Sequence, residues 1–201
     1  MAAENRDVFV NCPFDIDYRP LFNAIVFTVI RSGFRARCAL EADNAAENRF
    51  DKICKIVSEC RYGIHDISRT EVDGNPPLPR FNMPLELGLF LGAKKYGGAR
   101  HREKSCIIFD REQYRFQRYI SDIAGQDIHA HRGEPASLIV ELAAWLRIHS
   151  GDAQVPGGVA IGNEFIAFEE ALPAIYAARQ LDPGEVTFGD YNAVVVQYLT
   201  A

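Results

Sequence analysis

Ten residues of this 201-residue chain carry side chains of the types that hold sugars and nucleosides. They are carboxylates, amides, arginines, hydroxyls and aromatic rings near the ends of predicted strands or the start of a predicted helix. The set is Asn11, Phe14, Asp15, Tyr18, Asp66, Ser68, Arg69, Arg80, Asn82 and Glu86. Amides and hydroxyls bind sugar hydroxyl groups, and a carboxylate stabilises positive charge at an anomeric carbon. We therefore expect a sugar or nucleoside site.

Glu86 is the one acidic residue in an otherwise apolar run over residues 85–93. The sequence predicts a helix here, with Asn82 as N-cap and Gly97 just past the end. The Glu86 side chain should point back towards the helix start, and so towards the strand ends. An acid in this position is either functional or paired, with Arg69, Arg80 or a backbone amide as its partner.

Two glycines, Gly88 and Gly92, lie four residues apart in the same helix. This spacing places them on one side of a helix. We expect them to let the helix approach the sheet closely.

Asp66 falls at the carboxyl end of a buried strand predicted over residues 62–67. The following dozen residues hold Gly74, Pro76, Pro77 and Pro79, and they predict a loop. Asp66 either takes part in chemistry or caps the next turn together with Ser68. For Tyr18 and Phe14 the alternatives are contact with a sugar and packing in the core.

Strands and helices alternate along the first 150 residues. Strands are predicted over 7–11, 35–40, 62–67, 105–109 and 127–130, and helices over 21–31, 50–60, 117–123 and 135–148, with a further helix from 82. This alternation predicts an α/β fold, a flavodoxin-like (Rossmann-like) parallel sheet of about five strands with helices on both faces. Ligands of such sheets bind beyond the carboxyl ends of the strands, here residues 11–15, 41–44, 66–69 and 110.

A glycine- and proline-containing segment after Ser150 predicts a linker. We therefore divide the chain into an α/β domain over residues 1–150 and a helical appendage over 159–201. The appendage should contain helices around a break at Pro173, and a last helix capped by Thr187 and Asp190. It holds no catalytic constellation, so we expect contacts with a second copy or another protein.

Composition narrows the function classes. The net charge of −5 gives no general attraction to phosphate backbones, so a nucleic-acid partner is not expected. The five cysteines and five histidines are scattered, and they indicate reduced thiols and no metal site. No run approaches the length of a membrane span, and the first residues lack the pattern of a signal peptide, so we expect a cytoplasmic protein. Neither a GxGxxG fingerprint, a P-loop nor a GxSxG elbow occurs.

Three features together resemble a known family: VNCPF at residues 10–14, Asp66 ending the third predicted strand, and MPLELGLFLGAKKYG at residues 83–97. They are similar to the nucleoside 2-deoxyribosyltransferases and to their relatives among the Toll/interleukin-1 receptor (TIR)-like domains. The likeness covers roughly residues 7–110. In the transferases the corresponding helix has a glutamate two residues before a glycine, as Glu86 stands before Gly88. The chain departs from the family at 81–84, where Phe-Asn-Met-Pro replaces a glycine-threonine-type entry.

The resemblance implies cleavage or transfer at an N-glycosidic bond, with Glu86 at the anomeric carbon. A purine or pyrimidine leaving group needs a proton, for which Asp66 is the expected donor, whereas a nicotinamide needs none. Arg69 or Arg80, with the helix start at Asn82, would meet a phosphate. No cofactor is required, and NAD is a candidate substrate. The alternative is a non-catalytic TIR-like nucleotide-sensing or protein-interaction module.

Overall fold

The computed structural model describes residues 5–41, 46–70, 72–73 and 78–200. Five parallel strands form one sheet in the order β2-β1-β3-β6-β7. Their bounds are Asp7–Asn11 (β1), Arg35–Arg37 (β2), Tyr62–Asp66 (β3), Ser105–Asp110 (β6) and Ile128–Ala130 (β7). This strand order confirms the predicted flavodoxin-like fold class.

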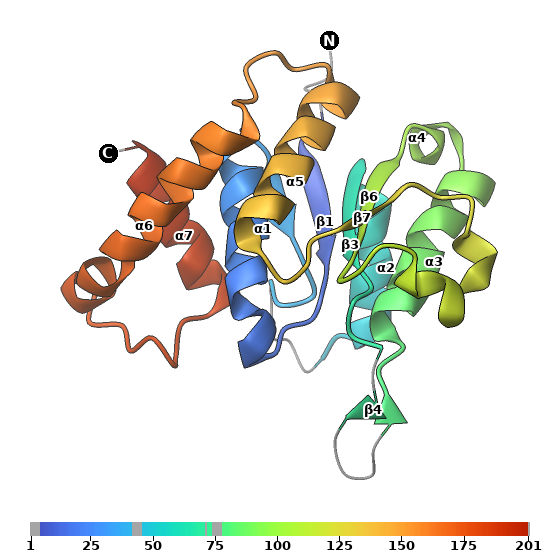
Figure 1. The fold of residues 1–201 in the computed structure, drawn as a ribbon, viewed down its shortest axis with the longest axis horizontal. Coiled ribbons are helices and arrows are strands. Elements are labelled where there is room, and N and C mark those ends of the chain that lie inside the picture. The colour runs from blue at the N-terminus through green and yellow to red at the C-terminus, as the bar shows by residue number, and fades with distance from the viewer. Residues whose placement is uncertain (1–4, 42–45, 71, 74–77, 201) are drawn as a thin grey trace.

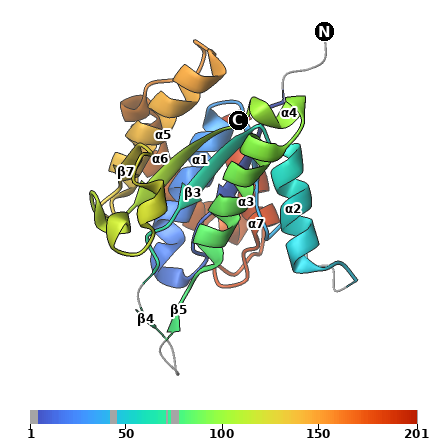
Figure 2. The ribbon, with the colours of Figure 1, turned by 90° about the vertical axis from the view of Figure 1, so that its right-hand side faces the viewer.

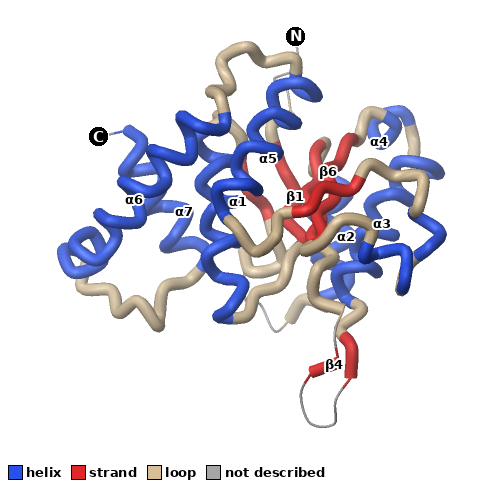
Figure 3. The backbone as a smooth tube through the Cα atoms, viewed as in Figure 1, coloured by secondary structure: helices blue, strands red, loops and turns tan. Residues whose placement is uncertain are grey.

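Helices cover both faces of the sheet (Figures 1 and 3). The α-helices are Arg19–Arg31 (α1), Arg49–Glu59 (α2), Asn82–Tyr96 (α3), Ala99–Arg102 (α4), Pro135–Ser150 (α5), Gly158–Ala178 (α6) and Phe188–Thr200 (α7). Short 3₁₀ helices span Ile16–Tyr18, Arg115–Arg118 and Ser121–Ile123. Helices α1 and α5 lie on one face, and α2 and α3 lie side by side on the other (Figure 2).

Alternation along β1 fills the core on both faces. Val8 and Val10 belong to the cluster under α1 and α5, whereas Phe9 packs with α2 and with Phe90 of α3. All five residues of β3 are buried because this central strand is paired on both edges and covered on both faces. Burial on both faces is expected for a central strand of a parallel sheet, and in β3 it includes two polar residues, His65 and Asp66.

Close packing between α3 and the sheet occurs at Gly63 and not at the two glycines of the helix. A Cβ atom on Gly63 would lie 2.9 Å from the Phe90 ring, so only glycine fits beneath that ring. No heavy atom lies within 4 Å of a Cβ atom built on Gly88 or on Gly92. The prediction that these two glycines bring the helix close to the sheet was wrong, because they face away from it.

The start of α3 also differs from the prediction. Asn82 is the first helical residue, and the N-cap is Phe81, which makes no side-chain cap hydrogen bond. The prediction of Asn82 as the N-cap was therefore wrong by one residue, and its side chain does not cap α3.

Two short strands lie within the segment after Ser68 that the sequence predicted as a loop. Val72–Asp73 (β4) pairs antiparallel with Leu78–Pro79 (β5), and this hairpin projects beyond the carboxyl edge of the sheet (Figure 1). Gly74, Pro76 and Pro77 lie outside the described residues. The helix predicted over 117–123 is replaced by two 3₁₀ helices.

The C-terminal helices form a further layer over α1 and α5. Phe165 and Phe168 of α6 contact Phe27 of α1, with ring centroids 5.4 and 5.1 Å apart. Residues of α6 and α7 share one apolar cluster with residues of α1 and α5. The predicted break at Pro173 was wrong: α6 continues through this residue. The predicted cap of α7 is confirmed: Thr187 Oγ1 accepts from Asp190 N at 3.2 Å, and Asp190 Oδ2 accepts from Thr187 N at 3.0 Å.

Within the described ranges, no helix is both long enough and apolar enough to cross a membrane.

Candidate functional site

The carboxyl ends of β1 and β3 meet at the point where the chain reverses its direction across the sheet, since β2 lies on one side of β1 and β3 on the other. Ligands of doubly wound sheets bind at such a point. Asn11, at the end of β1, is buried there, and its Nδ2 donates to the Met83 carbonyl at 2.9 Å and contacts His65 Nδ1 at 3.0 Å. Asn11 thereby ties the first turn of α3 to the strand ends.

His65 contributes no charge to this edge. Its ring is fully buried between Phe9 and Phe90, and burial lowers its pKa to about 3. The neutral Nδ1 accepts the hydrogen bond from Asn11, as an unprotonated imidazole can. The His65–Asn11 contact is thus a fixed support for α3.

Glu86 lies in a groove of about 360 Å³ between α2 and α3. The residues lining this groove, called here the Glu86 groove, are Asn48, Arg49, Phe50, Ile53, Asn82, Leu85, Glu86 and Leu89. Burial raises the pKa of Glu86 from 4.5 to about 7, and the Arg49 guanidinium acts in the opposite direction. Within the described part of the chain, the Glu86 carboxyl forms no hydrogen bond or ion pair. It is half-buried without a fixed partner.

The sequence predicted that Glu86 is either functional or paired with Arg69, Arg80 or a backbone amide. Neither Arg69 nor Arg80 pairs with it among the described residues; the nearby cation is Arg49. The Glu86 carboxylate raises the pKa of the buried thiols Cys12 and Cys38, after the larger effect of burial itself. These thiols follow β1 and β2, so the Glu86 carboxyl is within electrostatic range of the ends of both strands.

Asp66 occupies a different environment. Its carboxyl is 0% exposed; Oδ2 accepts from the Tyr18 hydroxyl at 2.7 Å and lies 3.1 Å from His131 Nε2, and Oδ1 accepts from Ser68 N at 2.9 Å. The bond to Ser68 N is the turn cap that one reading of the sequence predicted. Asp66, Tyr18 and Ser68 are thus brought together beneath the edge, but they do not line the Glu86 groove.

The remaining predicted residues are spread along the edge. Arg69 Nη2 lies 2.7 Å from Asp15 Oδ1 and 3.4 Å from Asp17 Oδ2, so two carboxylates already balance its charge. The Phe14 ring packs edge-on against the Phe22 ring, with the ring centroids 5.5 Å apart. Arg80 is exposed and lies just before α3. Of the ten candidate residues, only Asn82 and Glu86 share the Glu86 groove.

Asp110, at the end of β6, is held in a closed network. Its Oδ1 lies 2.6 Å from Arg115 Nη2, and its Oδ2 accepts from the Tyr119 hydroxyl at 2.9 Å. The same Arg115 nitrogen donates to the Ser68 carbonyl at 2.7 Å. These bonds fix the β3 and β6 ends to each other and leave Asp110 no free oxygen for a ligand.

Sequence reasoning missed six of the eight residues that line the groove: Asn48, Arg49, Phe50, Ile53, Leu85 and Leu89. Asn48 caps α2, accepting from Phe50 N at 2.8 Å. The available signal for this helix start was Asn48 at the N-cap position, three residues before the acidic Asp51 in the first turn. It also missed His131, which follows β7 and is far from Asp66 in sequence.

No family model, curated protein or solved structure matches this chain. The case for a function therefore depends on the residues and their geometry. Among the described residues, no group of three or more His, Cys, Asp or Glu side chains is placed to hold a metal ion.

Proposed function

We propose that this protein binds a nucleotide or nucleoside in the Glu86 groove and cleaves, or transfers at, its N-glycosidic bond. The observation that carries the proposal is a half-buried carboxyl without a fixed partner, with a pKa near 7, at the carboxyl edge of a doubly wound sheet. A structural glutamate would be expected to have a partner, because an unpaired buried carboxylate is costly. Maintaining this one suggests a use for it.

In the proposed reaction, ionised Glu86 faces the anomeric carbon. The bond between that carbon and the base nitrogen breaks, its electron pair leaves with the base, and the carboxylate stabilises the positive charge left on the sugar. Water or an acceptor hydroxyl then forms the new bond to carbon and releases its proton. A pKa of about 7 leaves roughly half of the Glu86 side chains ionised at neutral pH.

The groove walls suit a planar ring. Phe50 on α2 and Leu85 on α3 are 48% and 53% exposed, although both are large apolar side chains. Stacking a base or nicotinamide between them would remove this apolar area from water. Arg49, next to Phe50, is placed to meet a phosphate or a sugar oxygen of the same ligand.

The burial of Asp66 bears on the leaving group. A purine or pyrimidine needs a proton as it departs, and the Asp66 carboxyl, with 0% exposure and three neighbours, is not presented to the groove. A nicotinamide is cationic in the substrate and leaves as a neutral molecule without a proton donor. This arrangement therefore favours NAD over ordinary nucleosides, with Asp66 as a positioning group.

The second candidate is a non-catalytic TIR-like module that binds the same ligand class and docks through α6 and α7. Its supporting observation is the exposure of three apolar side chains on those helices, Val159 (71%), Ile166 (57%) and Val196 (48%). Light scattering over a range of concentrations tests whether copies associate through this surface, and Ile166→Glu should then reduce the association.

The two candidates are separated by a chromatographic assay at low and high protein concentration. Wild type, Glu86→Gln and the exposed control Glu170→Gln are incubated with NAD and with a panel of nucleosides and nucleotides. If the protein is an enzyme, we expect wild type and Glu170→Gln to release base and Glu86→Gln not to do so. The released base identifies the leaving group. No turnover by folded wild type that still binds NAD would favour the binding module.

A further inference from the structure

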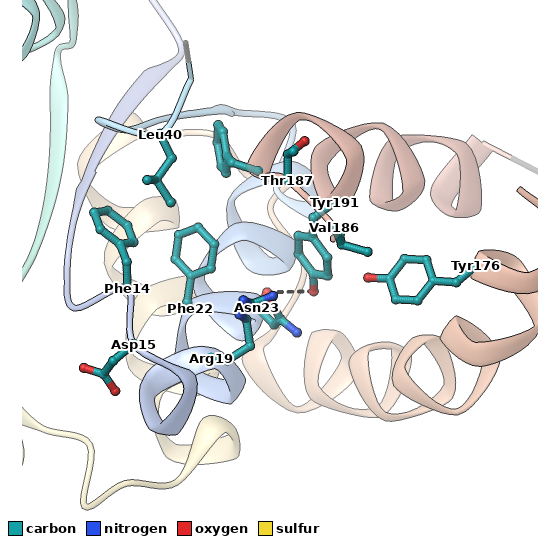
Figure 4. A pocket seen from close by; sticks show the side chains of 11 residues that line it. Phe14, Asp15, Arg19, Phe22, Asn23, Leu40, Tyr176, Val186, Thr187 and Tyr191 are labelled. Carbon is teal, nitrogen blue, oxygen red and sulfur yellow. Dashed lines mark hydrogen bonds between the residues drawn. The ribbon is translucent and has the colours of Figure 1, made fainter. Parts of the chain in front are cut away.

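A second cavity lies on the other side of the carboxyl edge, between the β1–α1 loop and the C-terminal helices (Figure 4). It measures about 80 Å³ and is separate from the Glu86 groove. Its lining residues are Phe14, Asp15, Arg19, Phe22, Asn23, Leu40, Tyr176, Val186, Thr187, Phe188 and Tyr191. They come from the β1–α1 loop, α1, the segment after β2, α6, α7 and the connection between α6 and α7.

The cavity wall is mainly apolar. Phe14, Phe22, Leu40, Val186 and Phe188 supply rings and branched alkyl groups, and Phe22 contacts Phe188 with ring centroids 6.0 Å apart. A wall of this kind favours an alkyl or aryl body over a purely polar ligand. An apolar cavity of about 150 Å³ holds benzene, so the present one suits a smaller, branched alkyl group.

Two polar groups at this cavity have no partner among the residues that the structure describes. Neither the Arg19 guanidinium nor the Tyr176 hydroxyl forms a hydrogen bond or ion pair with any described residue. By contrast, the Tyr191 hydroxyl is used, since it donates to the Asn23 carbonyl at 3.2 Å (Figure 4). Burial and the Glu169 carboxylate raise the pKa of Tyr176, and the Arg19 charge acts against them. Arg19 and Tyr176 both line this cavity.

Three carboxylates lie near the cavity, and each has a hydrogen-bond or ion-pair partner. Asp15 pairs with Arg69 at 2.7 Å and points away from the cavity in Figure 4. Burial raises the pKa of Glu169, whose carboxyl accepts from Asn23 Nδ2 at 3.4 Å. Asp190 accepts from the backbone of Thr187 in the cap of α7. Arg19 is the one arginine or lysine among the lining residues, and it forms no ion pair with a carboxylate of the described residues.

We propose that this cavity binds a small branched-chain carboxylate, with the alkyl group among the phenylalanines and the carboxylate between Arg19 and the Tyr176 hydroxyl. A guanidinium pairs with a carboxylate through two parallel hydrogen bonds, and a phenol adds a third donor. Such a ligand would join α6 and α7 to the β1–α1 loop. The proposal is independent of the Glu86 groove.

The test is an NMR titration of the full chain with isovalerate, read at the backbone amides around the cavity. Isovaleramide, which keeps the alkyl group and loses the charge, and inorganic phosphate, an anion without an alkyl group, are the comparison probes. We expect saturable shifts at Phe14, Asn23 and Tyr191 with isovalerate, and binding about tenfold weaker or more for both comparison probes.

Variants assign the contact. Arg19→Gln should weaken isovalerate binding about tenfold or more, Tyr176→Phe about threefold, and the exposed control Arg118→Gln by less than twofold. Tyr176→Phe keeps the ring and serves if Arg19→Gln does not fold. Absence of saturable shifts in wild type, equal binding of acid and amide, equal binding of phosphate, or no effect of both cavity variants would overturn the proposal.

Discussion

Glu86 combines a proposed function with a cost in stability. Its pKa is about 7 in the folded protein and near 4.5 when unfolded, so the folded state holds its proton more tightly. The contribution of Glu86 to the free energy of unfolding is therefore fully present below pH 4.5, where the side chain is protonated. It is lost as the pH rises from 4.5 through 7. A carboxylate that weakens the fold at neutral pH is typical of functional sites.

Replacing Glu86 with glutamine should remove this cost. At pH 8 we expect Glu86→Gln to raise the free energy of unfolding by about 1–3 kcal/mol, and to change it little near pH 4.5. Urea unfolding at both pH values measures the difference, with Glu170→Gln as a control that should not respond. A variant less stable than wild type at pH 8 would mean that the carboxylate belongs to a stabilising pair.

Asp66 should behave in the opposite way. Its carboxyl is fully buried and receives bonds from the Tyr18 hydroxyl and Ser68 N, so Asp66→Asn places an amide where donors converge. We expect a loss of about 2–4 kcal/mol for Asp66→Asn and about 1–2 kcal/mol for Tyr18→Phe in urea unfolding at pH 7. If Asp66→Asn unfolds like wild type yet abolishes turnover, Asp66 is a catalytic group and not a positioning one.

At the scale of elements, the contact between β3 and α3 sets the position of Glu86. Gly63 allows the Phe90 ring to lie directly on the strand, and Asn11 fixes the first turn of the helix through the Met83 carbonyl. Glu86 follows Met83 by three residues, about one helical turn. The contacts that fix Met83 therefore also set the position of Glu86.

A matched pair of glycine variants tests this packing. Gly63→Ala should destabilise the protein by about 1–3 kcal/mol, because its Cβ would overlap Phe90. Gly88→Ala meets no atom within 4 Å and removes a flexible residue from a helix, so it should stabilise the protein by about 0.5–1 kcal/mol. Thermal unfolding compares the two, and similar effects for both variants would contradict the assigned contact.

The sequence predicts elements well where periodicity and end signals agree. The five strands of the parallel sheet and the Thr187–Asp190 cap followed from such local patterns. The direction in which Gly88 faces did not, because spacing shows that two glycines share a side of a helix but not which side meets the sheet. Pro173 was taken as a break, yet α6 passes through it. Leu172 before the proline and Tyr176 after it are both buried in the core shared with α1 and α5.

The candidate site was predictable in part for the same reason. Glu86 and Asn82 are on one helix, so their proximity is local information. His131 contacts Asp66 from the end of another strand, and Arg49 reaches the groove from α2. Such meetings are decided by the tertiary fold, and no spacing along the chain encodes them.

For the whole molecule, the C-terminal helices complete the core. Phe27 is fully buried beneath Phe165 and Phe168, and α6 and α7 cover the outer side of α1 and α5 (Figure 1). Residues 158–200 therefore stabilise the α/β layer in addition to any contact they make with a partner.

Removal of residues 151–201 should expose this apolar layer. We expect the shortened chain to lose cooperative thermal unfolding and to aggregate, because several large side chains of α1 and α5 would lie in water. Circular dichroism and size-exclusion chromatography measure both effects. A shortened chain that stays monomeric and unfolds in one sharp transition would show that the α/β layer is an independent domain.

The most direct test of the Glu86 proposal is the pH dependence of NAD cleavage by concentrated protein. If ionised Glu86 stabilises the sugar cation, kcat/KM rises with pH, bends near pH 7 and then stays level, since the pKa of Glu86 is about 7. Glu86→Gln should show a rate lower by about 100-fold or more without that bend. A variant that keeps the rate and the bend of wild type would contradict the assignment of Glu86 as the catalytic carboxylate.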